Sequence, residues 1–298
     1  MGYLTLIDYL DSNNVEYCDN VNLADLVSIR VGGSGDLVVY PKSTSELIDI
    51  VRLLKGKRYF LLGNGTNCYF TSQRYNGVII VTKLLNNAVC KDNFIYAECG
   101  TSLSKLCNLA LNHSLSGLEF AFGIPATLGG AVYMNAAAYG SMISSVINTS
   151  LVYDSLKDET VTLTNNEHNF SKKSSVLHGG RFIHLSSELF LNFGEKDVIF
   201  KKMQACLKSR NATQPSSLPN AGSVFINPCV GFASKMIDEC GLKGFRIGDA
   251  QVSTKHAGFI VNLGSASSDD INNLIAIIKK RVFDKFNINL NEEIIYVE

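Results

Sequence analysis

The spacing of apolar residues along the chain predicts alternating helices and strands. After Ser43-Thr44-Ser45-Glu46, which has the form of a capping box, apolar residues recur at helical spacing at Leu47, Ile50, Val51 and Leu54. The same spacing predicts helices near residues 103–111, 199–211, 235–240 and 271–282. Short apolar runs predict strands at 59–62, 78–81, 94–97, 182–191, 259–261 and 294–297, and residues 151–164 predict a hairpin. We therefore expect a mixed α+β fold of two or three lobes.

A turn-rich segment interrupts this alternation. Residues 212–232 hold three of the five prolines, which predicts a domain boundary there. A chain of 298 residues corresponds to about two domains by length alone. The length therefore agrees with a boundary in this segment.

Composition narrows the class of protein. The chain is 46% hydrophobic and 18% charged, which is typical of a globular protein, and its 27 basic and 27 acidic residues argue against a nucleic-acid partner. No apolar run reaches membrane-spanning length, and the start of the chain lacks the pattern of a signal peptide, so we expect a cytoplasmic protein without a membrane partner. The eight cysteines show no Cys-x-x-Cys spacing and the five histidines no zinc spacing, so we expect reduced thiols and no metal.

A glycine-containing loop, Gly63-Asn64-Gly65-Thr66-Asn67, follows the strand predicted at 59–62. Glycines allow backbone N–H groups to turn toward phosphate oxygens, and Thr and Asn add side-chain donors. The loop is not a dinucleotide fingerprint, because Cys68 stands where the third glycine belongs, and it is not a Walker loop. By itself, the pentapeptide fits a tight surface turn better than a phosphate site.

Residues 117–140 are rich in Ala and Gly and contain one charged residue, Glu119. Small residues at this density allow backbones to pack closely, or a flat ligand to approach the backbone. Close helix packing accounts for the small residues, whereas a binding wall against a planar cofactor also accounts for the embedded polar residues Thr127 and Asn135. The run alone leaves both interpretations open.

Two further polar residues are candidates for chemistry. Ser223, beside Gly222, could donate a proton or act as a nucleophile, although a lone serine of this kind is more often a turn residue. The chain has no G-x-S-x-G elbow, which argues against an acyl-enzyme hydrolase. Glu293, at the start of the last predicted strand, reads by itself as an exposed charge.

Taken in order, the motifs resemble those of the UDP-N-acetylenolpyruvoylglucosamine reductase family, flavin enzymes that make UDP-N-acetylmuramate for peptidoglycan and cell-wall biogenesis. The resemblance covers nearly the whole chain. Each motif alone is weak evidence for the family, but their occurrence together in the same order is specific to it. The motifs are Ser28-Ile29-Arg30-Val31-Gly32-Gly33, residues 62–67, residues 117–140, Gln214-Pro215, residues 221–228, Gly241-Leu242-Lys243-Gly244 and residues 252–259.

The resemblance implies the fold and the reaction. The fold would be α+β, with an FAD-binding module of the vanillyl-alcohol-oxidase (PCMH) type in two lobes, residues 1–55 and 56–205, and a C-terminal α+β substrate-binding domain, residues 206–298. In the family, NADPH reduces the flavin, which passes hydride to the enolpyruvyl group of the UDP-sugar substrate. The absence of a long tyrosine-bearing insert implies the shorter subtype, and the family implies a monomer.

The resemblance also assigns roles to residues of this chain. It implies that Ser223 protonates the substrate, and that Glu293 and Lys173 stabilise the enolate that develops. It assigns substrate contacts to Gln214 and Asn227. The flavin contacts that it implies are Arg30, Gly63, Asn64, Gly65, Thr66, Asn67, Gly123, Ile124, Pro125, Thr127, Gly129, Gly130, Ala131, Asn135 and Ala137.

The chain departs from the family pattern at several of these positions. Lys173 and Lys172 stand where the family has arginine and tyrosine, and lysine lacks the planar two-point grip of arginine on a carboxylate. Ile226 occupies a position that is commonly basic, and Ala126 and Ala137 replace glycines. These changes keep two alternatives open beside the reductase: an FAD-binding paralogue with weakened or lost activity, regulatory or non-catalytic, and a related FAD oxidase acting on a sugar or hydroxy acid.

Overall fold

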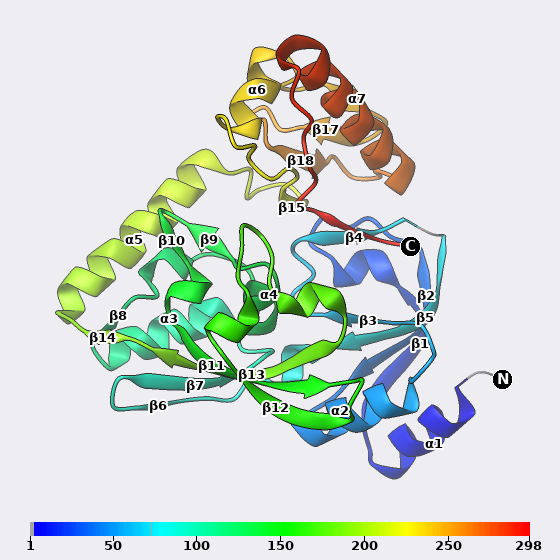
Figure 1. The fold of residues 1–298 in the computed structure, drawn as a ribbon. Coiled ribbons are helices and arrows are strands. Elements are labelled where there is room, and N and C mark those ends of the chain that lie inside the picture. The colour runs from blue at the N-terminus through cyan, green and yellow to red at the C-terminus, as the bar shows by residue number, and fades with distance from the viewer. Residues whose placement is uncertain (1–2, 72) are drawn as a thin grey trace. The chain divides into compact units, whose positions relative to one another are not determined.

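The computed structural model describes residues 3–71 and 73–298, which divide into two compact units. The first unit comprises Met1–Asp19, Leu37–Asn64 and Gly77–Lys208, and the second comprises Asn20–Asp36, Gly65–Asn76 and Ser209–Glu298. Each unit is therefore assembled from segments that lie far apart in the sequence. Figure 1 shows the elements along the chain.

The first unit is built mainly on a five-stranded sheet with the strand order β12-β11-β13-β7-β6. All neighbours in this sheet are antiparallel. Helices α3 and α4 pack against β7, and α4 also packs against β13 (Figure 1). The strands are β6 (Ala88–Lys91), β7 (Phe94–Glu98), β11 (Ile147–Asp154), β12 (Glu159–Thr164) and β13 (Phe182–Phe190), and the helices are α3 (Leu103–Asn112) and α4 (Leu128–Tyr133).

Further elements complete the first unit or run from one unit into the other. A four-stranded sheet has the order β1-β2-β5-β3, in which β3 and β5 are parallel, and β9 and β10 form a short hairpin. The bounds are α1 (Leu4–Ser12), β1 (Glu16–Asn22), β2 (Ser34–Tyr40), α2 (Thr44–Leu53), β3 (Tyr59–Leu62), β5 (Arg74–Val81), β8 (Leu115–Ser116), β9 (Ala137–Ala138), β10 (Ser141–Met142), β14 (Asn192–Phe193) and α5 (Lys196–Thr213).

The second unit contains a four-stranded sheet with the order β15-β18-β17-β16 and a parallel pair of β19 with β4. Helices α6 and α7 pack against each other, and α7 also packs against β16 and β17 (Figure 1). The bounds are β4 (Cys68–Phe70), β15 (Asn220–Ser223), α6 (Ala233–Glu239), β16 (Arg246–Ile247), β17 (Ala250–Val252), β18 (Phe259–Asn262), α7 (Ser268–Phe286) and β19 (Ile295–Val297).

Side-chain hydrogen bonds explain where the predicted helices α2 and α7 begin. The hydroxyl of Ser43 caps α2 by accepting from the N–H of Glu46, as predicted, but the Glu46 carboxylate accepts from Lys42 rather than from Ser43. A reciprocal capping box instead begins α7, between Ser267 and Asp270. The predicted apolar stripe of α7 is buried: Ile271, Leu274, Ile275, Ile278 and Val282.

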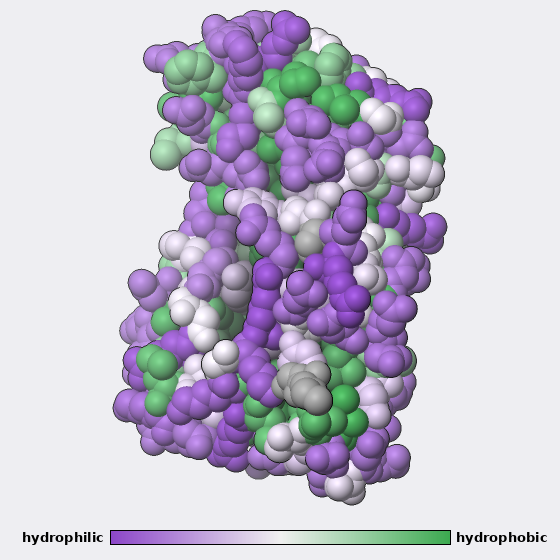
Figure 2. Space-filling view, turned by 90° about the vertical axis from the view of Figure 1, so that its right-hand side faces the viewer, coloured by the Kyte–Doolittle hydropathy of each residue, from purple (hydrophilic) through white to green (hydrophobic). Residues whose placement is uncertain are grey.

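Burial follows the sequence pattern. In the first unit, one core cluster includes Leu106, Ala131 and Leu189, and a second includes Leu47, Val78 and Leu185. The face of the molecule in Figure 2 is mostly hydrophilic, with hydrophobic residues in separate patches. Among the described residues, no helix combines the length and apolar character needed to cross a membrane.

The predicted α+β class is confirmed, as are the predicted helices and strands, to within a few residues at their ends. The helix predicted at 199–211 is longer and runs from Lys196 to Thr213. The short helix α4 inside the Ala/Gly run was not predicted, because its six residues include two adjacent glycines. The division into residues 1–55, 56–205 and 206–298 stays a prediction.

Candidate active site

The two glycines of the 63–67 loop are required by packing within the protein. A Cβ on Gly65 would lie 2.2 Å from the carbonyl oxygen of Leu26, and its φ of +65° favours glycine. A Cβ on Gly63 would lie 2.4 Å from the hydroxyl oxygen of Thr127. The glycines are thus needed whether or not a phosphate binds.

A carbonyl and two side-chain amides of this loop take part in hydrogen bonds that hold it. Within the first unit, the Asn64 side-chain amide donates to the carbonyl of Pro125 at 2.8 Å. Within the second, the Gly65 carbonyl accepts from Ser28 at 2.8 Å, and the Asn67 amide donates to the carbonyl of Glu293 at 3.0 Å. These three contacts are made through one carbonyl and two side-chain amides of the loop.

The polar residues of the Ala/Gly run have partners inside the first unit. Thr127 caps α4, where its hydroxyl accepts from the N–H of Gly130 at 3.4 Å. Asn135 is 4% exposed and has a left-handed backbone, φ +42°. Its amide nitrogen donates to the carbonyl of Ser171 at 3.0 Å, and its oxygen accepts from Ser144 at 3.2 Å. Both residues therefore stabilise the fold, and their contact with the flavin stays a prediction.

Lys173 lies in a tight two-residue turn that is attached to this run. Ser171 and Ser174 exchange backbone hydrogen bonds of 3.0 and 3.3 Å across the turn, and Lys173 has φ +60°. Beyond the turn, the hydroxyl of Ser175 donates to the carbonyl of Tyr133 at 3.0 Å. The bonds from Asn135 to Ser171 and from Ser175 to Tyr133 therefore attach both sides of the turn to the Ala/Gly run.

Ser223 and Glu293 come together in the second unit. The N–H of Glu293 donates to the carbonyl of Val224 at 2.7 Å, and Phe225 forms a β-bridge with Glu292. Ser223 follows Gly222, whose φ is +77°, and is half-buried. Among the described residues, no hydrogen bond engages the Ser223 hydroxyl, which leaves it available to a ligand. The chain segments that carry these two candidates, 70 positions apart in the sequence, are thus paired through their backbones.

Arg30 is held by a residue that the sequence did not single out. Arg30 is exposed, and its φ of +56° is a left-handed backbone conformation that is unfavourable for residues other than glycine. Surrounding contacts have to stabilise it. The amide of Asn262, which is 2% exposed, donates to the carbonyls of Ile29 at 3.0 Å and Arg30 at 3.3 Å. Asn262 carries no sequence signal for this role, because Ile29 and Arg30 are more than 230 positions away.

The two predicted substrate contacts also have partners in the second unit. The side-chain oxygen of Gln214 accepts from Arg210 at 2.7 Å, just beyond the end of α5. The side-chain oxygen of Asn227 accepts from the N–H of Ala233, the first residue of α6, at 3.0 Å. The structure therefore gives each a role in the fold, and the substrate contacts stay predictions.

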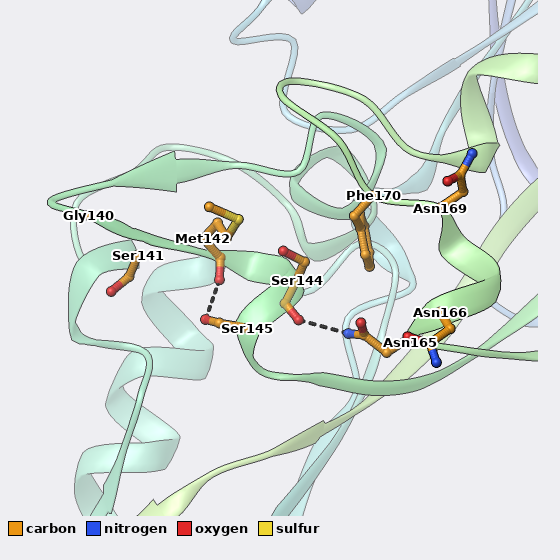
Figure 3. Close-up of a pocket in the computed structure, with 9 residues that line it drawn as sticks. All are labelled: Gly140, Ser141, Met142, Ser144, Ser145, Asn165, Asn166, Asn169 and Phe170. Carbon is orange, nitrogen blue, oxygen red and sulfur yellow. Dashed lines mark hydrogen bonds between the residues drawn. The ribbon is translucent and has the colours of Figure 1, made fainter.

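A surface hollow of about 570 Å³ in the first unit is lined by the end of the Ala/Gly run and by Phe170, which precedes the turn of Lys173 (Figure 3). It is lined by uncharged residues: Gly140, Ser141, Met142, Ser144, Ser145, Asn165, Asn166, Asn169 and Phe170. Because it offers no cationic side chain, it does not suit a diphosphate or a carboxylate. Figure 3 shows that two of its polar groups are engaged within the protein, since Ser145 bonds to Met142 and Asn165 to Ser144. It contains none of the candidate site residues.

The residues of the loop and the run fit FAD. The loop lies against the start of the run, since the Asn64 amide donates to the carbonyl of Pro125 at 2.8 Å, and residues 63–67 and 123–137 include no acidic side chain that would repel a pyrophosphate. Residues 35–156 match a family model described as an FAD binding domain, and residues 214–297 match the C-terminal domain of UDP-N-acetylenolpyruvoylglucosamine reductase. The chain is thus a flavoprotein, an FAD-dependent oxidoreductase with a separate C-terminal domain, as the resemblance predicted.

Comparison with whole proteins gives the family. The chain is 40% identical to the UDP-N-acetylenolpyruvoylglucosamine reductase of Caldicellulosiruptor bescii, over 97% of this chain and 93% of that protein. It is 41% identical to the enzyme of the same name from Caldanaerobacter subterraneus subsp. tengcongensis, over 90% and 89%. The crystal structure of that reductase (MurB) from Thermus caldophilus superposes with a TM-score of 0.81 at 30% identity, covering 95% and 99%. The chain belongs to the UDP-N-acetylenolpyruvoylglucosamine reductase family.

Proposed function

We propose that this chain reduces UDP-N-acetylglucosamine enolpyruvate to UDP-N-acetylmuramate, using FAD and NADPH, in the synthesis of peptidoglycan precursors. Family membership over nearly the whole chain supports this proposal. The observation that carries it is the pairing of the segments that hold Ser223 and Glu293, since the N–H of Glu293 donates to the carbonyl of Val224.

FAD would be held by the 63–67 loop, by the run from Gly123 to Ala137 and by Arg30. When bound, it would supply hydride transfer from the reduced nicotinamide to the methylene carbon of the enolpyruvyl group. The protein then has to manage the negative charge that this addition creates on the substrate.

Ser223 supplies the proton that completes the reduction. Hydride addition to one carbon of the double bond leaves an electron pair on the neighbouring carbon, and the proton of the Ser223 hydroxyl goes to that carbon. The Ser223 hydroxyl forms no hydrogen bond among the described residues, so its proton is available for this transfer. The double bond becomes a single bond, and solvent returns the proton to the serine oxygen.

Glu293 and Lys173 have the task of stabilising the enolate. A protonated carboxyl group of Glu293 can donate a hydrogen bond to the developing oxyanion, and the ammonium of Lys173 opposes its charge. Lysine supplies one point of charge where arginine would supply two parallel N–H groups, so we expect weaker orientation of the carboxylate and a reaction that still proceeds.

The reductase is favoured over the alternatives left open by the sequence. An FAD oxidase of another kind would not account for the C-terminal match over residues 214–297, and the similarity to named reductases speaks against a non-catalytic paralogue. NADPH as the reductant, a monomeric state and a cytoplasmic location are parts of the proposal. The eight unpaired cysteines agree with a reducing compartment.

The experiment that tests the proposal is product formation by the purified holoenzyme. Incubation with NADPH and UDP-N-acetylglucosamine enolpyruvate should yield a product two mass units heavier than the substrate, identified by mass spectrometry as UDP-N-acetylmuramate. An FAD-loaded protein that oxidises no NADPH in the presence of this substrate, and forms no such product, would contradict the proposal.

A further inference from the structure

A buried chain of four polar side chains links β11 and β13 of the five-stranded sheet in the first unit. Nε2 of His168 lies 2.8 Å from the hydroxyl of Ser150, which lies 2.7 Å from the hydroxyl of Ser187, which lies 2.6 Å from Nε2 of His184. Ser150 and Ser187 face each other on β11 and β13. The exposed fractions are 0% for His168 and Ser150, 3% for Ser187 and 7% for His184.

The number of protons makes the two ends of this chain different. Three hydrogen bonds need three donated protons and the two hydroxyls supply one each, so one histidine donates from Nε2 and the other accepts there. Burial lowers the pKa of both imidazoles, that of His184 to about 3, so both rings are neutral at pH 7. Neither Nδ1 atom has a hydrogen-bond partner among the described residues.

The two ends of the chain also lie against different parts of the unit. The ring of His184 lies under the Ala/Gly run, where its Nδ1 is 3.4 Å from the place that a Cβ on Gly129 would occupy. The ring of His168 stacks on Phe170, with 4.7 Å between ring centroids and 16° between ring planes. Phe170 is the residue directly before the turn of Ser171 to Ser174 that carries Lys173.

We propose that His168 is a positioning residue for Lys173. The bond to Ser150 fixes the plane of the His168 ring, and the ring fixes Phe170. Phe170 in turn holds the start of a turn whose Lys173 backbone, at φ +60°, needs support from its surroundings. The role of Lys173 in the reaction rests on the proposed function, whereas the support of the turn by His168 does not.

Hydrogen exchange tests the support directly. The N–H groups of Ser171 and Ser174 bond across the turn, and we expect His168→Gln, which retains a nitrogen donor but loses the ring, to speed their exchange roughly tenfold or more. His184→Gln is the matched control, because it makes the same change at the other end of the chain and should leave these two amides as protected as in the unaltered protein. His168→Phe keeps a ring on Phe170 and should retain most of the protection.

Equal exchange of Ser171 and Ser174 in His168→Gln and His184→Gln would overturn the proposal. If His168→Gln does not fold, Phe170→Leu removes the other ring of the same stack and provides the same comparison, since Phe170 is only partly buried. Unchanged exchange in a folded Phe170→Leu variant would overturn the proposal as well.

A kinetic comparison separates this proposal from the proposed function. We expect His168→Gln to slow the reoxidation of reduced flavin by substrate roughly tenfold, with little effect on flavin reduction by NADPH. In a Lys173→Met background the same substitution should have little further effect, because the group it positions is gone. An equal loss in both backgrounds would contradict positioning through Lys173. Failure of the unaltered protein to use the substrate would contradict the proposed function and leave the exchange result standing.

Discussion

The N–H of Glu293 donates, over 2.7 Å, to the carbonyl oxygen of Val224, the residue that follows Ser223. This backbone bond pairs the chain segments of Ser223 and Glu293, which the sequence separates by 70 positions. Ile226 also donates to the carbonyl of Asn291, so the pairing continues on the N-terminal side of Glu293. The geometry of the proposed proton donor and of the charge-stabilising group is therefore set by main-chain bonds, and side-chain substitutions should change chemistry more than structure.

Substitution of Ser223 tests proton donation. Ser223→Ala should lower the rate of substrate reduction at least about a hundredfold, in line with the loss of a general acid, and leave flavin reduction by NADPH nearly unchanged. Stopped-flow absorbance of the flavin measures both half-reactions. Ser223→Cys, which keeps an ionisable proton, should recover part of the rate. A Ser223→Ala variant with undiminished substrate reduction would rule out the role.

Substitution of Glu293 tests stabilisation of the enolate. Glu293→Gln should reduce the rate of substrate reduction about tenfold or more, because the developing charge loses a carboxyl partner. Glu292→Gln is the matched control, because it removes a carboxylate one residue away. That carboxylate pairs with Lys279 at 2.8 Å on a partly exposed surface, so its loss should cost no more than about 1 kcal/mol of stability. Similar rates for the two variants would argue against a specific role for Glu293.

Alanine at Gly65 should damage the 63–67 loop. Its Cβ would lie 2.2 Å from the carbonyl oxygen of Leu26, so the loop has to shift, and we expect weaker FAD binding and lower stability. Gly56→Ala is the control, because Gly56 also has a positive φ, +75°, but open space around it. That change should cost only the left-handed strain of about 1–2 kcal/mol. Flavin fluorescence and urea unfolding of both variants make the comparison, and equal effects would refute the packing argument.

The buried histidines should make the first unit sensitive to acid. The pKa of His184 is lowered to about 3 by burial, so the folded state stays unprotonated while the unfolded state takes up a proton near pH 6.5. This stabilisation is complete above about pH 6.5 and is lost as the pH falls toward 3. Between pH 7 and pH 5 the loss for His184 amounts to about 2 kcal/mol. Urea unfolding at the two pH values should show a smaller loss in His184→Gln, and an identical loss would contradict the assignment.

Removal of the Asn262 side chain should loosen the Arg30 segment. Asn262→Leu leaves the carbonyls of Ile29 and Arg30 without the donor that they share, and the N–H groups of Gly264 and Ala266 without their acceptor. We expect a loss of roughly 2–4 kcal/mol, because several buried polar groups become unsatisfied at once. If Arg30 contacts the flavin, FAD affinity should fall as well. Thermal unfolding and flavin titration measure the two effects, and an unaltered melting temperature would contradict the structural role.

Local pattern was enough to predict much of the fold. The apolar stripe of α7 and the Ser43 cap of α2 depend on residues within one or two turns of each other, so the sequence shows them directly. The helix α4 was missed because a run of glycines and alanines gives no periodic signal. Its stability comes from the Thr127 cap and from packing on β7 and β13, which are distant in sequence.

The contacts of the candidate site could be predicted less well than the fold, because they join residues that are far apart in the sequence. Motif order along the chain pointed to Ser223, Glu293 and the loop, but gave no reason for their adjacency, which depends on the β-bridge between Phe225 and Glu292. The sequence also could not show that Thr127 and Asn135 have partners inside the protein. Asn262 and His168 were not found at all, because a buried asparagine or histidine is recognised by its partners, and these lie in other strands and loops.

Anaerobic reoxidation of the flavin by the substrate tests the central claim most directly. The holoenzyme is reduced with one equivalent of NADPH, mixed with UDP-N-acetylglucosamine enolpyruvate, and followed by flavin absorbance. We predict that the oxidised spectrum returns with one equivalent of substrate, and that in Ser223→Ala the flavin is reduced but stays reduced. A reduced flavin that the substrate never reoxidises in the unaltered protein, or that it reoxidises equally fast in Ser223→Ala, would contradict the account.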